Sequence, residues 1–65
     1  MKINIRAVKI LMAQKQLTHA QLAELAGISR PTITTLLTRG TCSIPNAGKL
    51  ADALGVEVEA IIDES

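Results

Sequence analysis

The side chains best suited to chemistry gather in one stretch of the 65-residue chain, between Thr18 and Gly40. Arg30 opens a run in which four of the seven residues from 32 to 38 are threonine. An arginine can pair bidentately with guanine O6 and N7, and a threonine can offer its hydroxyl to a base and its methyl to thymine. Arg30 can equally bind a phosphate, and the sequence does not separate the two. Threonine is a poor helix former, so the run is also consistent with a surface that merely tolerates it.

Catalytic and metal-binding chemistry lack the residues they need. His19 is the only histidine and Cys42 the only cysteine, so neither has a partner for a zinc site. The acidic residues are not paired with a base or a nucleophile, and no Ser-His-Asp, Cys-His or glycine-rich phosphate motif is present. We therefore expect no enzyme, no metal and no cofactor, and we interpret Cys42 as an incidental small residue rather than a redox switch.

The net charge of +1 hides an asymmetry along the chain. Residues 1–40 carry six basic side chains against one acidic one, a balance of +5, whereas residues 41–65 carry one basic against five acidic, a balance of −4. A basic front and an acidic rear suit a protein that presents one face to phosphates. Ordinary solvated helix faces would explain the same charges equally well.

Length and composition predict a single small domain over residues 1–65. A chain of this size buries only about 60 % of its unfolded surface, which leaves no room for a large substrate cavity. It has no aromatic residue, so its core must be aliphatic. Basic residues interrupt the first 16 positions, which argues against a signal peptide, and no apolar run approaches a membrane span. The lone cysteine fits a reducing compartment, and we expect a cytoplasmic protein.

The elements that would position the Thr18–Gly40 side chains are two short helices. Thr18 is an expected N-cap, and Gln21 completes a capping box three residues later. Gly27 can adopt the left-handed conformation that ends a helix. Ser29 is a second N-cap, and Pro31 follows in the first turn, where its missing N–H costs little. The expected apolar faces are Leu22, Ala23, Leu25 and Ala26 in the first helix and Ile33, Leu36 and Leu37 in the second.

Two short helices joined through a glycine-containing turn form a helix-turn-helix. This one, with its core at about 18–40, resembles the Cro/repressor-type (lambda-repressor-like) family of bacterial and phage regulators. A small residue such as Ala23 lets the two helices cross at close range. The resemblance covers nearly the whole chain and is carried by Ala23, Gly27, Ile28, Ile33 and Leu36, then by the run Leu-Ala-Asp-Ala-Leu-Gly-Val at 50–56 and by Ile61 and Ile62.

The sequence departs from the family pattern at two points. Pro31 replaces what is often a polar, base-reading residue and can offer only an apolar contact, such as one to a thymine methyl. The segment from Ile33 to Gly40 is one residue longer than usual, and Leu37 stands where the family often has an acidic residue. Either the helix runs longer here or the following loop differs.

The resemblance implies a compact, all-α, five-helix lambda-repressor-like domain, with the helix-turn-helix in the second and third helices. We expect the first helix to run from about Asn4 to Gln16. The fourth should be capped by Ser43 and end at Gly55, with Ala47, Leu50, Ala51 and Leu54 inward. Gly48 costs about 1 kcal/mol inside that helix, so either it permits close packing or the helix starts later. A short fifth helix is expected over Glu57 to Ile62, with Val58, Ile61 and Ile62 inward.

The same resemblance implies a DNA-binding surface. The second of the two helices would enter the major groove, with Arg30 the strongest single candidate and Thr35 at a base-contact position. His19 and Asn46, each near a helix N-terminus, would contact the DNA backbone, and Arg39 would either contact a phosphate or serve the helix dipole. The full expected set is His19, Ser29, Arg30, Pro31, Thr32, Thr34, Thr35, Thr38, Arg39 and Asn46.

We therefore predict a sequence-specific, double-stranded-DNA-binding transcriptional regulator, most simply a small repressor. Family members often dimerise through their apolar C-terminal end, because a palindromic site needs a two-fold protein, and a homodimer is expected at least on DNA. Two alternatives stay open: an antitoxin that also restrains a toxin, and a protein-interaction bundle that has lost DNA binding. A further protein partner is compatible with each reading.

Overall fold

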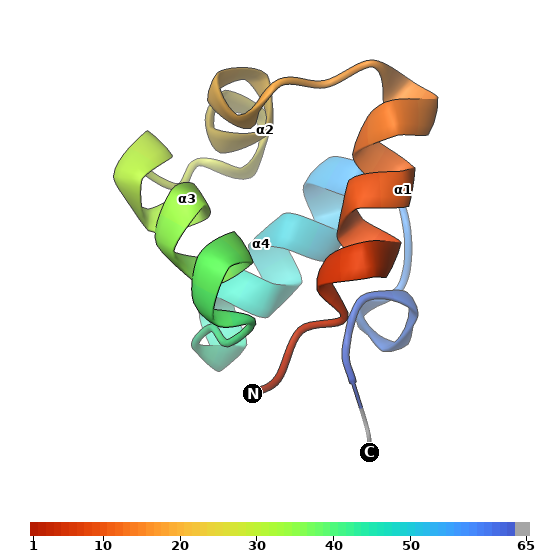
Figure 1. Cartoon of the computed structure of the whole chain (residues 1–65), viewed down its shortest axis with the longest axis vertical. Coiled ribbons are helices and arrows are strands. Elements are labelled where there is room, and N and C mark those ends of the chain that lie inside the picture. The colour runs from red at the N-terminus through yellow and green to blue at the C-terminus, as the bar shows by residue number, and fades with distance from the viewer. Residues whose placement is uncertain (64–65) are drawn as a thin grey trace.

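The computed structural model describes residues 1–63 and contains four α-helices (Figure 1). They are α1 (Ile5–Lys15), α2 (His19–Ala26), α3 (Arg30–Arg39) and α4 (Ile44–Leu54), and one turn of 3-10 helix, η1 (Val58–Ala60), follows. The chain is compact, with a radius of gyration of 10.1 Å. In Figure 1, α4 lies between α3 and α1, and both ends of the chain reach the same side of the molecule. Within the described part of the chain, no helix is long and apolar enough to cross a membrane.

Each α-helix begins at a polar residue whose side chain accepts a main-chain N–H from the first turn. These caps are Asn4, Thr18, Ser29 and Ser43. At Thr18 the capping box is complete, because Thr18 Oγ1 accepts the Gln21 N–H at 3.1 Å and Gln21 Oε1 accepts the Thr18 N–H at 2.9 Å. A cap of this kind stabilises a helix by about 1 kcal/mol. The predicted starts of all four helices are therefore confirmed.

The core is aliphatic and lies between α2 and the helices packed on it, chiefly α3 and α4. The expected inward residues of α3 and α4 are all buried. Leu25 is the exception among the predicted core positions, because its side chain is 61 % exposed. With about 100° between successive residues, Leu25 falls roughly 100° from the centre of the face formed by Leu22, Ala23 and Ala26. The core-facing stripe of α2 is therefore narrower than the apolar pattern suggested.

The prediction of five helices is wrong, since no α-helix forms over Glu57 to Ile62. Only the single turn η1 forms, and from Ile61 the chain is drawn into pairing with the N-terminal segment. The Asn4 N–H donates to the Ile61 carbonyl at 2.7 Å, and the Asp63 N–H donates to the Lys2 carbonyl at 3.1 Å. The Ile61 side chain is fully buried. A helix through these residues would have to give up those main-chain bonds.

The N-terminal segment also pairs on its other side, with the end of α3 and the loop after it. The Ile3 N–H donates to the Gly40 carbonyl at 2.8 Å, and the Cys42 N–H donates to the Met1 carbonyl at 3.0 Å. The Ile3 side chain is 4 % exposed and belongs to the core. The sequence analysis did not anticipate this segment. The alternation of apolar and polar residues from Met1 to Ile5 was the available signal, because period two is typical of extended backbone.

Gly48 was expected either to permit close helix packing or to precede a later start of the fourth helix, and both expectations are wrong. The fourth helix already begins at Ile44, and a Cβ built on Gly48 would meet no atom within 4 Å. Gly48 lies exposed on α4. The glycine therefore permits no close helix packing within the chain, and its cost to helix stability is uncompensated there.

We predict that Gly48→Ala raises the free energy of unfolding by about 0.5–1 kcal/mol, because alanine has less backbone freedom to lose. Gly27 is a matched control, since a Cβ there also meets nothing within 4 Å but its φ is +69°. Gly27→Ala should lower the free energy of unfolding by about 1 kcal/mol, through the left-handed backbone alone. Urea denaturation measures both. A Gly48→Ala variant that is less stable than the unmodified protein would contradict the conclusion that this glycine has no packing role.

Candidate nucleic-acid interface

A tight turn at Gly27 sets the angle between α2 and α3. Gly27 has φ +69° and ψ +29°, and its N–H turns back onto the carbonyls of Ala23 and Glu24. The Ile28 N–H donates to the Ala23 carbonyl at 3.1 Å, and the Ile28 side chain is buried in the core. Ser29 then caps α3. The chain thus ends one helix and starts the next within three residues, which confirms the predicted helix-turn-helix.

Ala23 occupies the packed side of α2 and is only 6 % exposed. Its small side chain lets the neighbouring helices approach, as ridges-into-grooves packing brings helix axes to about 8–10 Å. The position therefore has a physical requirement for a small residue, in agreement with the sequence analysis.

The helix α3 has a buried side and an exposed side. Ile33, Leu36 and Leu37 point into the core. At about 100° per residue, Pro31, Thr35 and Thr38 fall within about 60° of one another, opposite the core residues. All three are exposed. They form one stripe along the middle of the outward face, which we call the central stripe.

Two arginines bracket this stripe. Arg30 is the first residue of α3 and Arg39 the last, so their Cα atoms are separated by about 13 Å of helix rise at 1.5 Å per residue. Both side chains are exposed. Arg30 lies on the flank of the outward face rather than at its centre, which places its long side chain beside the central stripe.

The hydroxyls of two threonines in the central stripe are already engaged. Thr35 Oγ1 donates to the Pro31 carbonyl at 2.9 Å, and Thr38 Oγ1 donates to the Thr34 carbonyl at 2.8 Å. Threonine side chains in helices commonly donate to the carbonyl four residues earlier. The sequence alone leaves these hydroxyls free to bond a base, whereas in the structure their hydrogens are committed within the helix.

Ser29 and Thr32 are also brought together, with their hydroxyl oxygens 2.6 Å apart. Ser29 Oγ in addition accepts the Thr32 N–H at 3.4 Å. Both residues therefore build the N-terminal turn of α3. Their contribution to an interface would come through that turn, whose N–H groups and dipole favour an anion.

The two remaining predicted site residues lie on other helices. His19 is the first residue of α2 and is exposed, whereas Asn46 is half-buried in the first turn of α4. The Asn46 N–H donates to Ser43 Oγ at 3.3 Å. Both lie at helix N-termini, where an anion is favoured. The expected set therefore falls into one continuous group on α3 and two separate helix starts.

One basic residue has a structural position that the sequence did not reveal. Lys15 Nζ lies 3.6 Å from the point that a Cβ would occupy at Gly55, the residue that caps the C-terminus of α4. The C-terminal end of a helix carries partial negative charge, so an ammonium there is stabilising. Lys15 therefore serves the contact between α1 and α4.

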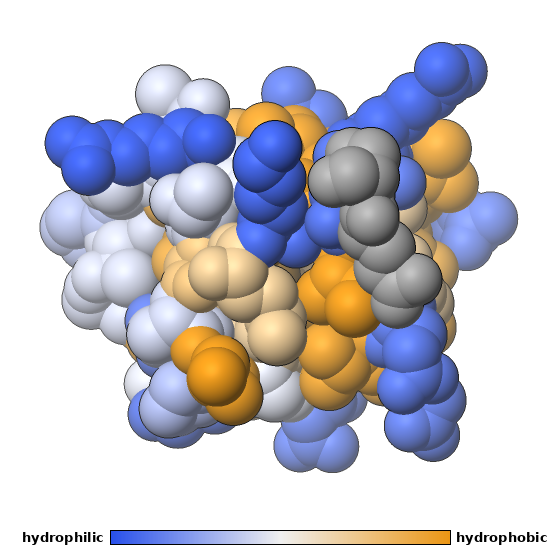
Figure 2. Space-filling view, turned by 90° about the horizontal axis from the view of Figure 1, so that it is seen from below, coloured by the Kyte–Doolittle hydropathy of each residue, from blue (hydrophilic) through white to orange (hydrophobic). Residues whose placement is uncertain are grey.

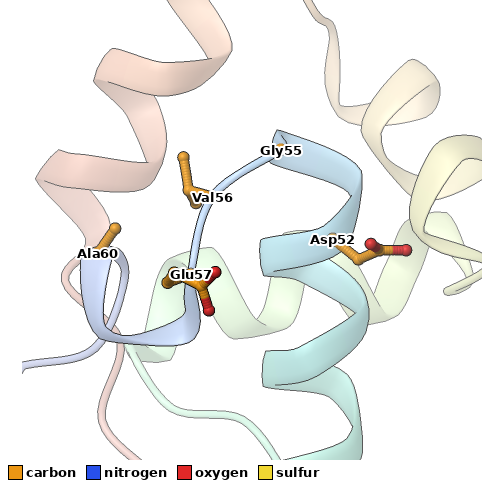
Figure 3. Close-up of a pocket in the computed structure, with 5 residues that line it drawn as sticks. All are labelled: Asp52, Gly55, Val56, Glu57 and Ala60. Atoms are coloured by element: carbon orange, nitrogen blue, oxygen red, sulfur yellow. The ribbon is translucent and has the colours of Figure 1, made fainter.

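The acidic rear of the molecule contains a shallow hollow lined by Asp52, Gly55, Val56, Glu57 and Ala60 (Figure 3). The Asp52 carboxylate points away from Glu57, so the two acids do not converge as an acid–base pair would. Among residues 1–63, no group of three or more potential ligands could hold a metal ion. Burial raises the pKa of the Cys42 thiol, which keeps it protonated at neutral pH.

Comparison with known proteins identifies one family. The model of the Cro/C1-type helix-turn-helix DNA-binding domain matches residues 7–63, which is most of the chain. No curated protein matches the chain. The matched region contains all of α2, α3 and α4, and it begins in the first turn of α1. The resemblance seen in the sequence is confirmed.

We predict that Ala23→Leu lowers the free energy of unfolding by about 1–3 kcal/mol, because a larger side chain overfills the packed side of α2. Ala20→Leu is the matched control. It makes the same change in the same helix at an exposed position and should stay within about 0.5 kcal/mol of the unmodified protein. Urea denaturation followed by circular dichroism gives both values, and equal effects of the two substitutions would contradict the packing argument.

Proposed function

Since the chain belongs to the Cro/C1-type helix-turn-helix DNA-binding domain family, we propose that it is a sequence-specific regulator of transcription, acting as a small repressor. Residues 1–65 act as one domain, and α3 enters the major groove of double-stranded DNA. Bound there, the protein blocks access to the promoter. We place it in the cytoplasm of a bacterium, encoded on the chromosome, on a mobile element or by a phage.

The observation that carries the proposal is the outward face of α3. It is exposed along its length, holds an arginine at each end and carries no acidic residue. A helix about 10–12 Å in diameter, with polar and small side chains on one face, fits the major groove, which is about 12 Å wide. The basic balance of residues 1–40 supports the proposal, because it would favour association with a phosphate backbone.

We assign the residues of the site to two tasks. Base edges are read by Arg30, Pro31, Thr34, Thr35 and Thr38, which lie on or beside the outward face of α3. The DNA backbone is bound at the helix starts and at the far end of α3. This second group consists of His19, Ser29, Thr32, Arg39 and Asn46.

We further propose that the protein binds DNA as a homodimer. The end of the molecule seen in Figure 2 shows apolar surface between hydrophilic side chains. Ile44 is 73 % exposed, and Met1 is also exposed. Burying such side chains against a second copy would be favourable, and two copies would read two half-sites about one helical turn apart.

A second candidate function has one observation in its favour. Leu25 is exposed on α2, beside a hollow that Leu17, Gln21 and Glu24 also line. An apolar side chain in such a place suits a protein partner. An antitoxin would use this surface to restrain a toxin while α3 binds DNA, and a pure protein-interaction bundle would use it alone.

We predict that the unmodified protein binds random-sequence duplex DNA with an affinity that falls steeply as salt rises. If Arg30 contacts a phosphate, Arg30→Ala should flatten the slope of log affinity against log salt by about one. If Arg30 reads a base, the slope of log affinity against log salt should be unchanged. The preference for a selected site over random DNA should then fall by about 1–3 kcal/mol.

Arg30→Lys is the matched control, because lysine keeps the charge and loses the two-pronged geometry. It should preserve phosphate binding and fail to restore base reading. The absence of DNA binding by the unmodified protein at low salt would reject the regulator and favour the protein-interaction bundle.

A further inference from the structure

The central stripe of α3, formed by Pro31, Thr35 and Thr38, offers no free hydrogen-bond donor. The proline side chain is a hydrocarbon ring. The hydroxyl hydrogens of Thr35 and Thr38 are committed to the carbonyls of Pro31 and Thr34, at 2.9 and 2.8 Å. Strong donors occur instead on the flank of the same face, where Arg30 begins the helix.

These bonds fix what each threonine can present to a ligand. An hydroxyl that donates its hydrogen still has lone pairs, so its oxygen remains an acceptor. The bond also holds the side chain in one rotamer, which fixes the direction of the methyl group. Turning the hydroxyl outward as a donor would break the bond inside the helix. Each threonine of the stripe therefore presents an acceptor and a methyl.

The four bases differ in how they meet such a surface. In the major groove guanine shows only acceptors, N7 and O6, and these need donors. Adenine shows the N6 amino donor, and thymine carries the C5 methyl group. Cytosine shows an N4 amino donor as adenine shows N6, so the threonine oxygens can accept from either base and do not separate A·T from G·C pairs. The threonine methyls and the proline ring, in contrast, find an apolar partner only in the thymine methyl.

We propose that Pro31, Thr35 and Thr38 select A·T base pairs at the centre of each half-site, through the thymine methyl groups, while the donors of Arg30 face the flanking pair. This inference rests on the proposed DNA-binding function and adds the class of base that the middle of α3 reads. It makes the methyl groups of Thr35 and Thr38 the atoms that determine specificity.

The first experiment selects binding sites from a randomised duplex with the unmodified full chain, and then replaces each central thymine by uracil. That replacement removes only the C5 methyl. We expect affinity to fall about three- to tenfold at the thymines under the stripe, and to stay unchanged at thymines outside the half-sites. Selected sites with guanine-rich centres, or central uracils without effect, would overturn the inference.

Two variants of Thr35 separate the methyl from the oxygen. Thr35→Ser keeps the hydroxyl and removes the methyl, so at one central position thymine and uracil should then bind equally well. Thr35→Val keeps a methyl and removes the oxygen, so the uracil penalty should remain. Circular dichroism and urea denaturation verify that both variants are folded. An unchanged uracil penalty at every position in Thr35→Ser would reject the role of Thr35.

The outcomes distinguish this inference from the function beneath it. Absence of any DNA binding by the folded chain at low salt would reject the DNA-binding proposal itself. Specific binding to sites with guanine at the centre would leave the regulator intact and reject only the proposed reading of A·T pairs.

Discussion

The close packing of α2 against α3 and α4 is the interaction on which the rest of the structure depends. The packed side of α2 is formed by Leu22, Ala23 and Ala26, all buried. The left-handed turn at Gly27 leaves only three residues between the end of α2 and the start of α3, so the position of α3 follows from that of α2. A chain without aromatic residues has no large side chain to fill a gap, and a misplaced α2 would leave cavities that cost stability throughout the core.

The outer end of α3 is held by a second constraint, the pairing of the chain's two ends. The N-terminal segment bonds to Gly40 and Cys42 on one side and to Ile61 and Asp63 on the other. Because Ile3 is buried between them, this pairing joins the end of α3 to the core. The capped N-terminus and the tied C-terminus together present α3 as a rigid surface, which lowers the entropy that binding would have to overcome.

The threonines of α3 show how helix stability and recognition can share the same atoms. Threonine is disfavoured in helices because of its branched side chain, and its hydroxyl competes for the backbone. In Thr35 and Thr38 that competition is satisfied inside the helix. The bond removes a donor from the exposed surface, so the chemical character of the outward face depends on local helix geometry as well as on residue type.

The sequence by itself determined the local features of this protein. Caps, turn glycines and apolar spacing were sufficient to place four helices, the helix-turn-helix and most of the core, because each acts within a few residues. Three features depend on the tertiary structure: the exposure of Leu25, the absence of a fifth α-helix over Glu57 to Ile62 and the pairing of residues 1–4. They involve partners up to about sixty residues away along the chain. The tertiary structure also placed Lys15 at the end of α4. Residue types fix which bonds are possible, and only the folded arrangement decides which of them are made.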